Sequence, residues 1–377
     1  MTPELRRETE FDRAAHPQTG CPVNTHNEWD PLEEVIVGRL EGATVASNHI
    51  AVTAAIPGKT TQWLAKITGG WKYPGFLLRE AQRELEGFVD LLVDLGITVR
   101  RPEPMDFSVS FKTPYWKSRG FANTCPRDSL LAIGDEIIEA PMAWRCRYFE
   151  AHSFRPLLKE YFRRGARWSA APKPELRDDL YDPDYRPPAD GEPVKYVINE
   201  FEPVFDAADF VRCGADLFVT RSNVTNRSGI DWLRRHLGGS YGIHEIESRS
   251  RYPMHIDTTV LPLAPGRLLV NPEYVDVSRL PEMFKSWDIL IAPEPDPVTG
   301  RLQRFVSMAS RWLSVNVLSI DEKRVIVEKD QVSLMRLLER HGFEPIPCAF
   351  ASYAPFGGSF HSATLDIRRR GERQCYF

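Results

Sequence analysis

The sequence lacks the cysteine patterns of a disulfide framework or a structural zinc site. No two of its six cysteines form a CxxC pair, and their spacing follows no zinc-binding motif. They stand at positions 21, 125, 146, 213, 348 and 375. Scattered thiols of this kind are typical of a reducing compartment, so we expect a cytoplasmic protein.

Long apolar runs and a surplus of positive charge are also missing. No run reaches the roughly 18 apolar residues that a membrane helix needs. Met1 to Gly20 mix arginines with acidic residues, unlike a signal or transit peptide. The 48 lysines and arginines face 52 acidic residues, for a net charge of -4. We therefore expect neither a membrane nor a nucleic acid as a partner.

Nucleotide-binding motifs and clustered metal ligands are absent as well. No GxGxxG opens a helix after a strand and no P-loop sequence occurs, so a Rossmann arrangement has no support. His255 and Asp257 stand two residues apart without a second histidine or a clear third ligand nearby. We expect no cofactor and no metal.

The chain nevertheless has the size and composition of a folded enzyme. Its 377 residues are 42% hydrophobic, which supports a substantial buried core. Residues 1–20 are polar and unpatterned, so we expect a flexible N-terminal extension followed by a single domain over residues 21–377. Within that domain, Arg155 to Lys195 are interpreted as a helix followed by a long surface excursion.

Five short apolar runs have the composition of β-strands. They are Glu34–Gly38, Leu130–Gly134, Leu217–Thr220, Leu268–Asn271 and Arg324–Glu328. Amphipathic helical stripes follow several of them, each ended by a glycine and succeeded by another apolar segment. The stripes cover residues 85–95, 230–237 and 334–341. A recurring strand–helix–strand unit favours a radial α/β repeat over a doubly wound sheet.

Four segments place polar residues in apolar surroundings and are the candidates for chemistry. They are Cys125–Asp128, Phe205–Phe210, Pro253–Asp257 and Gly357–Ser362. A carboxylate such as that of Asp206, flanked by Phe205 and Ala207, must find donors or shift its pKa when buried.

Each of these segments also has an ordinary structural interpretation. Asp128 can pair with the adjacent Arg127, Asp206 can cap a helix, and His255 can be a satisfied core histidine. The two glycines can form a simple turn. The adjacency of His361 and Ser362 does not indicate a shared site, because successive side chains of a strand point to opposite faces.

Taken together, these segments resemble the arginine:glycine amidinotransferase family from about Cys21 to Tyr376. The resemblance rests on the strings CPVNTHNEWDPLEEVIVG, TCPRDSLLAIGDEIIEAPMAWRCRYFE, EFEPVFDAADFVRCGADLF, RYPMHIDTT, RWLSVNVLSIDEKRV and GGSFHSATLDIRRRG. It implies the pentein fold, an α/β propeller of five ββαβ units around a pseudo-fivefold axis. It further implies transfer of the amidino group of L-arginine to a primary amine, releasing ornithine through a covalent intermediate, and a possible homodimer.

The resemblance assigns roles to individual residues. Asp128 and Asp257 match the carboxylates that hold the guanidinium, a planar cation suited to paired hydrogen bonds. His255 matches the acid/base, and Asp206 the carboxylate that orients it. Ser310 matches a position near the substrate. Met254 matches the glycine-using enzymes, at a position that helps to set acceptor size in other members.

Ser362 departs from the family pattern, which has cysteine directly after the histidine of the FH pair. A free cysteine thiol has a pKa of about 8.5 and provides a thiolate near neutral pH, whereas a serine hydroxyl needs a base during the attack. Cys348 and Cys375 offer no substitute. We expect the chain to bind arginine and turn over very slowly or not at all. An engineered substitution is the simplest cause, and a non-catalytic relative or a productive serine are the alternatives.

Tyr274 is a second departure, at a position where the glycine-using vertebrate enzymes have a carboxylate-binding arginine. A single hydroxyl replaces a bidentate cation, so glycine is weakened as the acceptor and a natural-product amine is at least as well supported. Met254 points the other way. A hydrolytic pentein of the arginine deiminase type and a non-catalytic guanidine-binding protein remain alternatives to the transferase.

Overall fold

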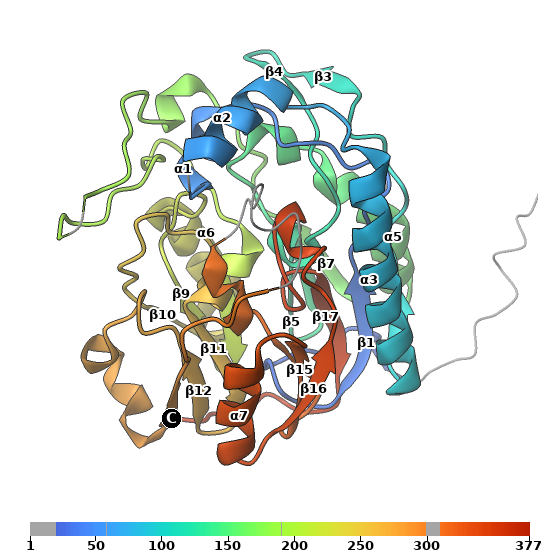
Figure 1. Cartoon of the computed structure of the whole chain (residues 1–377), viewed down its shortest axis with the longest axis vertical. Helices are drawn as coiled ribbons and strands as arrows, with labels where there is room; N and C mark the ends of the chain where they lie inside the picture. The colour runs from blue at the N-terminus through green and yellow to red at the C-terminus, as the bar shows by residue number, and fades with distance from the viewer. Residues whose placement is uncertain (1–19, 58, 190, 299–309) are drawn as a thin grey trace, which may run out of the picture.

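The computed structural model describes residues 20–57, 59–189, 191–298 and 310–377 (Figure 1). The predicted N-terminal extension, residues 1–20, lies outside the described residues apart from Gly20. None of the helices within these ranges is long and apolar enough to cross a membrane.

Within the described residues, five three-stranded sheets repeat one pairing pattern, in which the middle strand pairs antiparallel with one neighbour and parallel with the other. The sheets are β17–β1–β2 (Thr364–Arg369, Leu32–Val37, Thr98–Arg100), β5–β6–β7 (Leu130–Ile133, Glu136–Glu139, Arg167–Ala170), β8–β9–β10 (Phe210–Cys213, Asp216–Val219, Gly242–Glu245), β11–β12–β13 (Val260–Ala264, Arg267–Val270, Asp288–Ile291) and β14–β15–β16 (Leu318–Ser319, Arg324–Glu328, Glu344–Cys348).

A crossover connects the two parallel strands of each sheet, because parallel neighbours cannot be joined by a tight hairpin. Four of the crossovers contain a helix, namely α3 (Gly75–Asp94), α5 (Arg155–Arg163), α6 (Arg227–Leu237) and α7 (Val332–Arg340). The fourth sheet along the chain uses the 3-10 turns η8 (Val277–Arg279) and η9 (Glu282–Ser286) instead. The repeat is therefore ββαβ in four units and has lost its α-helix in one.

The predicted strands and helices are confirmed. Each of the five apolar runs falls in a different sheet, and the three amphipathic stripes coincide with α3, α6 and α7. The interpretation of Arg155 to Lys195 was wrong in part. After α5 this segment forms β7 and then buries Leu176 and Leu180 in a core cluster, so much of it is structural.

The core of each repeat forms where a helix packs on its own sheet. The buried face of α3 carries Ala81, Leu85, Phe88 and Leu92. Burial of a leucine or phenylalanine side chain stabilises the folded protein by roughly 1.5–3 kcal/mol. The buried face of α3, and not its exposed residues, therefore fixes the position of the helix. Phe88 also contacts Phe360, which stands two residues before Ser362. The first repeat thereby anchors the turn that carries the predicted nucleophile position.

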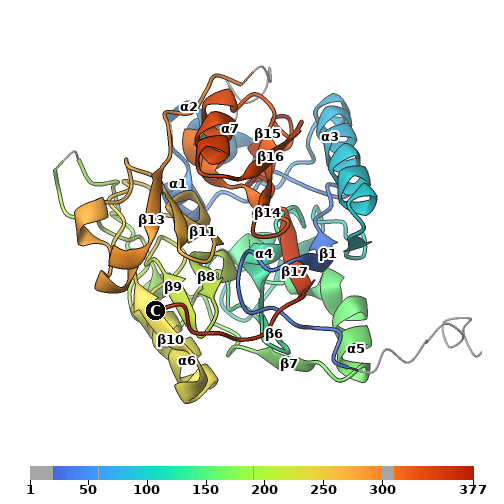
Figure 2. The ribbon, with the colours of Figure 1, turned by 90° about the horizontal axis from the view of Figure 1, so that it is seen from below.

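In each sheet the strand that pairs antiparallel with the middle strand is called the first strand, namely β5, β8, β11, β14 and β17. These first strands lie nearest to the middle of the molecule. Seen from below, β8, β11, β14 and β17 are grouped centrally, whereas α3, α5, α6 and α7 lie towards the periphery (Figure 2). Contacts between β17 and β5 and between β11 and β8 join neighbouring sheets. The segments that lead into these first strands therefore converge, and they carry the predicted site.

The remaining elements lie near one end of the propeller. They are α1 (Ile50–Ala55), α2 (Lys59–Thr68) and the hairpin of β3 (Ser110–Lys112) with β4 (Lys117–Arg119) (Figure 1). Ala55 at the end of α1 lines the central cavity.

Candidate active site

The candidate clamp and catalytic residues stand shortly before the first strands of four sheets. Asp128 lies in the short helix α4 (Pro126–Ser129) ahead of β5, and Asp206 directly precedes the 3-10 turn η5 (Ala207–Asp209) ahead of β8. His255 and Asp257 lie at η7 (Ile256–Thr258) ahead of β11. Ser362 lies in a turn ahead of β17. The repeat of the fold thus brings polar segments from four of the sheets to the centre.

The structure brings these residues together. Seven of the eight line one cavity, namely Asp128, Met254, His255, Asp257, Tyr274, Ser310 and Ser362. Asp206 lies behind His255, whose Nε2 is 3.1 Å from Oδ2 of the aspartate. The candidate residues thus surround one cavity, and their catalytic and binding roles stay predictions.

His255 is held in a strained conformation between two carboxylates. Its φ of 59° is in a region that residues other than glycine rarely occupy. Its Nε2 donates to Asp206, and its Nδ1 lies 3.7 Å from Oδ1 of Asp128. Burial alone would lower the pKa of His255, but the charges of Asp128, Asp206 and Asp209 raise it to about 10. The ring is therefore a cationic proton donor at neutral pH.

Asp128 and its neighbour Arg127 do not pair with each other. Arg127 instead binds Glu28 and Asp366, while Nη1 of Arg147 donates to Oδ2 of Asp128 at 2.7 Å. Adjacent residues in a helical turn do not face one another, which explains the separation. Burial raises the pKa of Asp128 above its usual range, although His255 and Arg147 oppose the shift.

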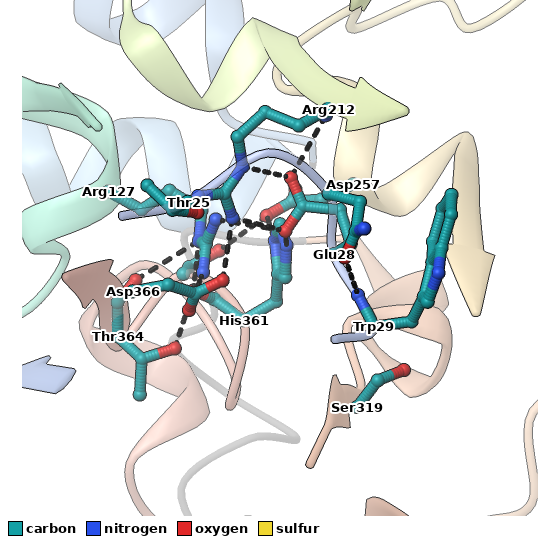
Figure 3. Close-up of polar contacts among 12 residues, drawn as sticks. Thr25, Glu28, Trp29, Arg127, Arg212, Asp257, Ser319, His361, Thr364 and Asp366 are labelled. Carbon is teal, nitrogen blue, oxygen red and sulfur yellow. Dashed lines mark hydrogen bonds and ion pairs between the residues drawn. The ribbon is translucent and has the colours of Figure 1, made fainter. Parts of the chain in front are cut away.

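Asp257 accepts two hydrogen bonds from consecutive residues of the turn before β17. Nδ1 of His361 lies 2.8 Å and Oγ of Ser362 lies 3.2 Å from its Oδ2 (Figure 3 shows Asp257 and His361). Burial would raise the pKa of Asp257, but the hydrogen bond and charge of His361 bring it below its ordinary value, with help from His255 and Arg127. This carboxylate is ionised.

Asp128 and Asp257 each keep one oxygen that accepts no hydrogen bond within the described residues, although Nδ1 of His255 lies 3.7 Å from that of Asp128. Oδ1 of both residues is buried and finds no hydrogen-bond donor among the described residues. A buried acceptor left unsatisfied costs roughly 1–3 kcal/mol, and more for a charged group. Two such oxygens in one cavity indicate a ligand that supplies several donors and positive charge. A guanidinium has both properties.

Within the part of the chain that the structure describes, Ser362 has no strong base beside it. Nδ2 of Asn316 donates to its Oγ at 3.1 Å, and Oδ1 of Asn316 accepts from the backbone N–H of Ser362 at 3.1 Å. The carboxylate of Asp257 is the acceptor of its hydroxyl, and its lowered pKa makes it a weak base. The described contacts therefore position the hydroxyl without activating it.

The glycine pair before Ser362 is more than a turn. Gly357 has a φ of 117°, and a Cβ on Gly358 would lie 2.4 Å from Cβ of Ser362. That hypothetical Cβ would also lie 3.1 Å from Sγ of Cys125, which lines the same cavity. Cys125 opens one of the four candidate segments, but the sequence assigned it no role of its own. Burial and Asp128 raise the pKa of its thiol well above the usual range, so it does not replace the missing nucleophile.

Tyr274 and Ser310 form a hydroxyl pair at the cavity wall. The tyrosine OH and the serine Oγ are 2.6 Å apart, and Oγ also accepts from the backbone N–H of Trp312 at the start of η10 (Arg311–Val315). Burial raises the pKa of Tyr274, so the phenol keeps its proton. Tyr274 and Ser310 therefore offer neutral hydroxyl donors in place of a cationic side chain. The half-buried Met254 lines the same cavity.

Asp128, Asp206 and His255 are close enough for a metal ion, with one ligand atom from each within 4.8 Å of the others. Arg147 already supplies positive charge to these carboxylates, because its Nη1 lies 2.7 Å from Asp128 and 3.6 Å from Asp206. A histidine with a pKa of about 10 also holds the proton that a ligating nitrogen must lose. We therefore keep the expectation that the site works without a metal.

Comparison with known proteins places the chain among close relatives. No protein-family profile matches it. The chain is 46% identical over 356 residues to an L-arginine:L-lysine amidinotransferase of Pseudomonas savastanoi pv. phaseolicola, covering 94% of this chain and 96% of that protein. It is 46% identical over 366 residues to the mitochondrial glycine amidinotransferase of Danio rerio, covering 95% and 85%.

Solved structures agree in fold. The amidinotransferase of the saxitoxin biosynthetic pathway of Microseira wollei superposes with a TM-score of 0.88 at 52% identity, covering 95% of this chain and 100% of that one. A dimethylarginine dimethylaminohydrolase matches with a TM-score of 0.55 at 13% identity, covering 89% and 99%, and shows the fold alone.

The five repeats and the central polar cavity define a pentein, the class of guanidine-modifying α/β propellers. Within that class the chain belongs to the amidinotransferase family, since its relatives at 46% and 52% identity are amidinotransferases. The hydrolytic alternative is not supported, because the hydrolase matches only at the level of the fold.

Several residues of the site were given no role from the sequence. They are Glu28, Cys125, Arg147 and Asn316. All four stand in the strings that carry the family resemblance, which was the available signal. Nothing in the local sequence shows which buried partner each one meets.

Proposed function

We propose that this cavity binds L-arginine and is built to transfer its amidino group to a primary amine. The observation that carries the proposal is that the buried Oδ1 atoms of Asp128 and Asp257 accept no hydrogen bond from the described residues. They accept hydrogen bonds from the guanidinium, whose charge offsets the two buried carboxylates. Asp128 and Asp257 are far apart in the chain, and they meet in the cavity because each precedes the first strand of a sheet.

The protein groups fit a transfer in two steps when the residue at position 362 is cysteine. The thiolate attacks the guanidinium carbon, and the bond from that carbon to the ornithine nitrogen breaks while His255 donates a proton to the departing amine. An acceptor amine then attacks the same carbon, His255 takes its proton, and the carbon–sulfur bond breaks. Asp206 orients the ring throughout and stabilises its charged form.

The serine at position 362 of this chain blocks the first step of the transfer, the attack on the guanidinium carbon. The hydroxyl of Ser362 meets a weak base in Asp257 and a donor in Asn316. His255 is already protonated and cannot take the hydroxyl proton before attack. We propose that the chain forms the arginine complex and turns it over very slowly or not at all.

The acceptor is proposed as a primary amine of the amino-acid or natural-product type. The named relatives act with lysine, act with glycine, or belong to saxitoxin biosynthesis, so the family takes amines of different size. Here Tyr274, Ser310 and Met254 shape the wall that an acceptor or the arginine carboxylate would contact. Hydroxyl donors suit either a carboxylate or a hydroxylated amine.

The deciding experiment compares Ser362→Cys with Ser362→Ala. Each is mixed with L-arginine and one of a panel of amines: glycine, β-alanine, lysine, hydroxylamine and aminated cyclitols. We expect Ser362→Cys to produce ornithine and a new guanidino compound at least about a hundredfold faster than Ser362→Ala. Citrulline as the main product would refute transfer in favour of hydrolysis. Arginine binding without any product would support the non-catalytic alternative.

We also propose a cytoplasmic homodimer. The reduced state of all six cysteines supports the compartment. Sedimentation velocity of the purified chain tests the dimer, and a monomer at micromolar concentration would contradict it.

A further inference from the structure

His361 contacts carboxylates through both of its ring nitrogens. Nδ1 lies 2.8 Å from Oδ2 of Asp257 and Nε2 lies 3.1 Å from Oε2 of Glu28. The side chain is 2% exposed, so water does not compete for either contact. An ionised carboxylate only accepts hydrogen bonds, and a ring that donates to two of them carries a proton on each nitrogen.

The carboxylate behind the ring is fixed by arginines. Arg212 binds both oxygens of Glu28, from Nε at 2.8 Å and from Nη2 at 2.6 Å, and Arg127 adds a contact at 3.3 Å (Figure 3). These charges hold the pKa of Glu28 well below its usual range, although burial opposes them. Asp366 also accepts from both arginines, through Nη2 of each.

The same network holds the backbone of the turn that carries His361. Nε of Arg127 donates to the carbonyl of His361 at 2.7 Å and to that of Thr364 at 3.0 Å. Side chain and backbone of His361 are therefore fixed by one buried set of charges. Its hydrogen-bonded link to the cavity runs through the ring of His361 to Asp257.

We infer that His361 is a positioning residue, which turns Oδ2 of Asp257 towards the protein and leaves Oδ1 aimed at the substrate guanidinium. The inference rests on the proposed function and adds a role that the sequence did not suggest. Without the ring, Oδ2 of Asp257 would keep only the hydroxyl of Ser362 as a donor, and the orientation of the carboxylate would be held less firmly. A fixed carboxylate binds a flat cation better than a mobile one.

Two variants separate the contacts of the ring. In asparagine the amide nitrogen is two bonds from Cβ, like Nδ1, whereas in glutamine it is three bonds away, like Nε2. His361→Asn therefore keeps the donor to Asp257, and His361→Gln keeps the donor to Glu28. Both variants remove the positive charge and have similar polarity, so each is the matched control of the other.

The measurement is the Kd of L-arginine by calorimetry on the full chain. We expect His361→Gln to weaken binding about tenfold or more and His361→Asn about threefold or less, because only the former removes the donor from Asp257. The charged groups that face Asp257 are His361 and Arg127 near β17 and His255 at η7. Loss of the His361 donor raises the pKa of Asp257. As the pH is lowered, the arginine affinity of His361→Gln should therefore begin to fall at a higher pH than that of His361→Asn.

Equal Kd values and equal pH profiles for the two variants would overturn the inference while leaving the proposed function intact. Failure of the unaltered chain to bind arginine at millimolar concentration would overturn both. If both variants fail to fold, nitrogen NMR of a His255→Asn chain decides. Two slowly exchanging N–H protons on the ring assigned to His361 support the inference, and their absence from that ring refutes it.

Discussion

Oδ2 of Asp257 accepts hydrogen bonds from both Nδ1 of His361 and Oγ of Ser362, at 2.8 and 3.2 Å. Two consecutive residues can meet one atom because they lie in a turn, where the alternation of a strand does not apply. The strand-based objection to a shared site was therefore wrong. One oxygen of this carboxylate now serves the protein, and the other is left for the ligand.

Removing either candidate clamp should weaken arginine binding. Asp128→Asn and Asp257→Asn each replace a charged acceptor by a neutral amide, which costs roughly 1.5–3 kcal/mol, or about ten- to a hundredfold in Kd. Calorimetry with the unaltered serine chain as reference measures the change. Asp184→Asn, at an exposed loop position, is the matched control and should bind like the reference. Unchanged affinity in both cavity variants would exclude a guanidinium between them.

The hydroxyl pair of Tyr274 and Ser310 is expected to bind the arginine carboxylate. Tyr274→Phe removes the hydroxyl that lies 2.6 Å from Ser310, so arginine affinity should fall about three- to tenfold. Agmatine, which is arginine without the carboxylate, provides the control ligand. Its affinity should be the same for both chains. An equal loss for arginine and agmatine would place the effect elsewhere in the cavity.

A reactive thiol should appear in the cavity only when Ser362 is replaced by cysteine. In Ser362→Cys the new thiol lies beside the amide of Asn316 in a cavity that also holds the cationic His255, both of which favour a thiolate. Cys125 stays protonated because burial raises its pKa. Iodoacetamide at neutral pH, followed by peptide mass spectrometry, should modify position 362 and leave position 125 intact. Faster modification of Cys125 would contradict the pKa argument.

Stability should depend on pH through His255. Its pKa is raised from 6.5 to about 10 in the folded chain, so protonation stabilises fully below pH 6.5 and this contribution is lost as pH rises towards 10. Against a His255→Asn reference, the difference in free energy of unfolding should shrink by on the order of 1 kcal/mol per pH unit in that window. Denaturant titrations between pH 7 and pH 9.5 measure it, in rough steps of one pH unit. A difference that stays constant would show that the ring is neutral in the folded state.

Much of the fold could be predicted from the sequence. Apolar runs such as Leu268–Asn271 and stripes such as that of α7 are local patterns, and local patterns report burial on one face of a helix or strand. The loss of the helix between β12 and β13 could not be foreseen from the repeat. Nor could β7, because its four residues have only intermediate or high exposure and therefore give little hydrophobic signal.

The site was predictable as a set of residues and less so as a set of contacts. The polar segments and the family resemblance named Asp128, Asp206, His255 and Asp257, and the structure gathers them. Partner choice among buried charges was not predictable. Arg127 passes over the adjacent Asp128 and binds Glu28 and Asp366 instead.

The sequence by itself determined the repeating α/β architecture, the family, and the replacement of a thiol by the hydroxyl of Ser362. These are properties of local pattern and residue identity, which the chain carries in any conformation. Only the tertiary structure decided that His361 reaches Asp257 and that Cys125 shares the cavity. Those contacts join residues about a hundred or more positions apart, and they exist because five first strands converge on one centre.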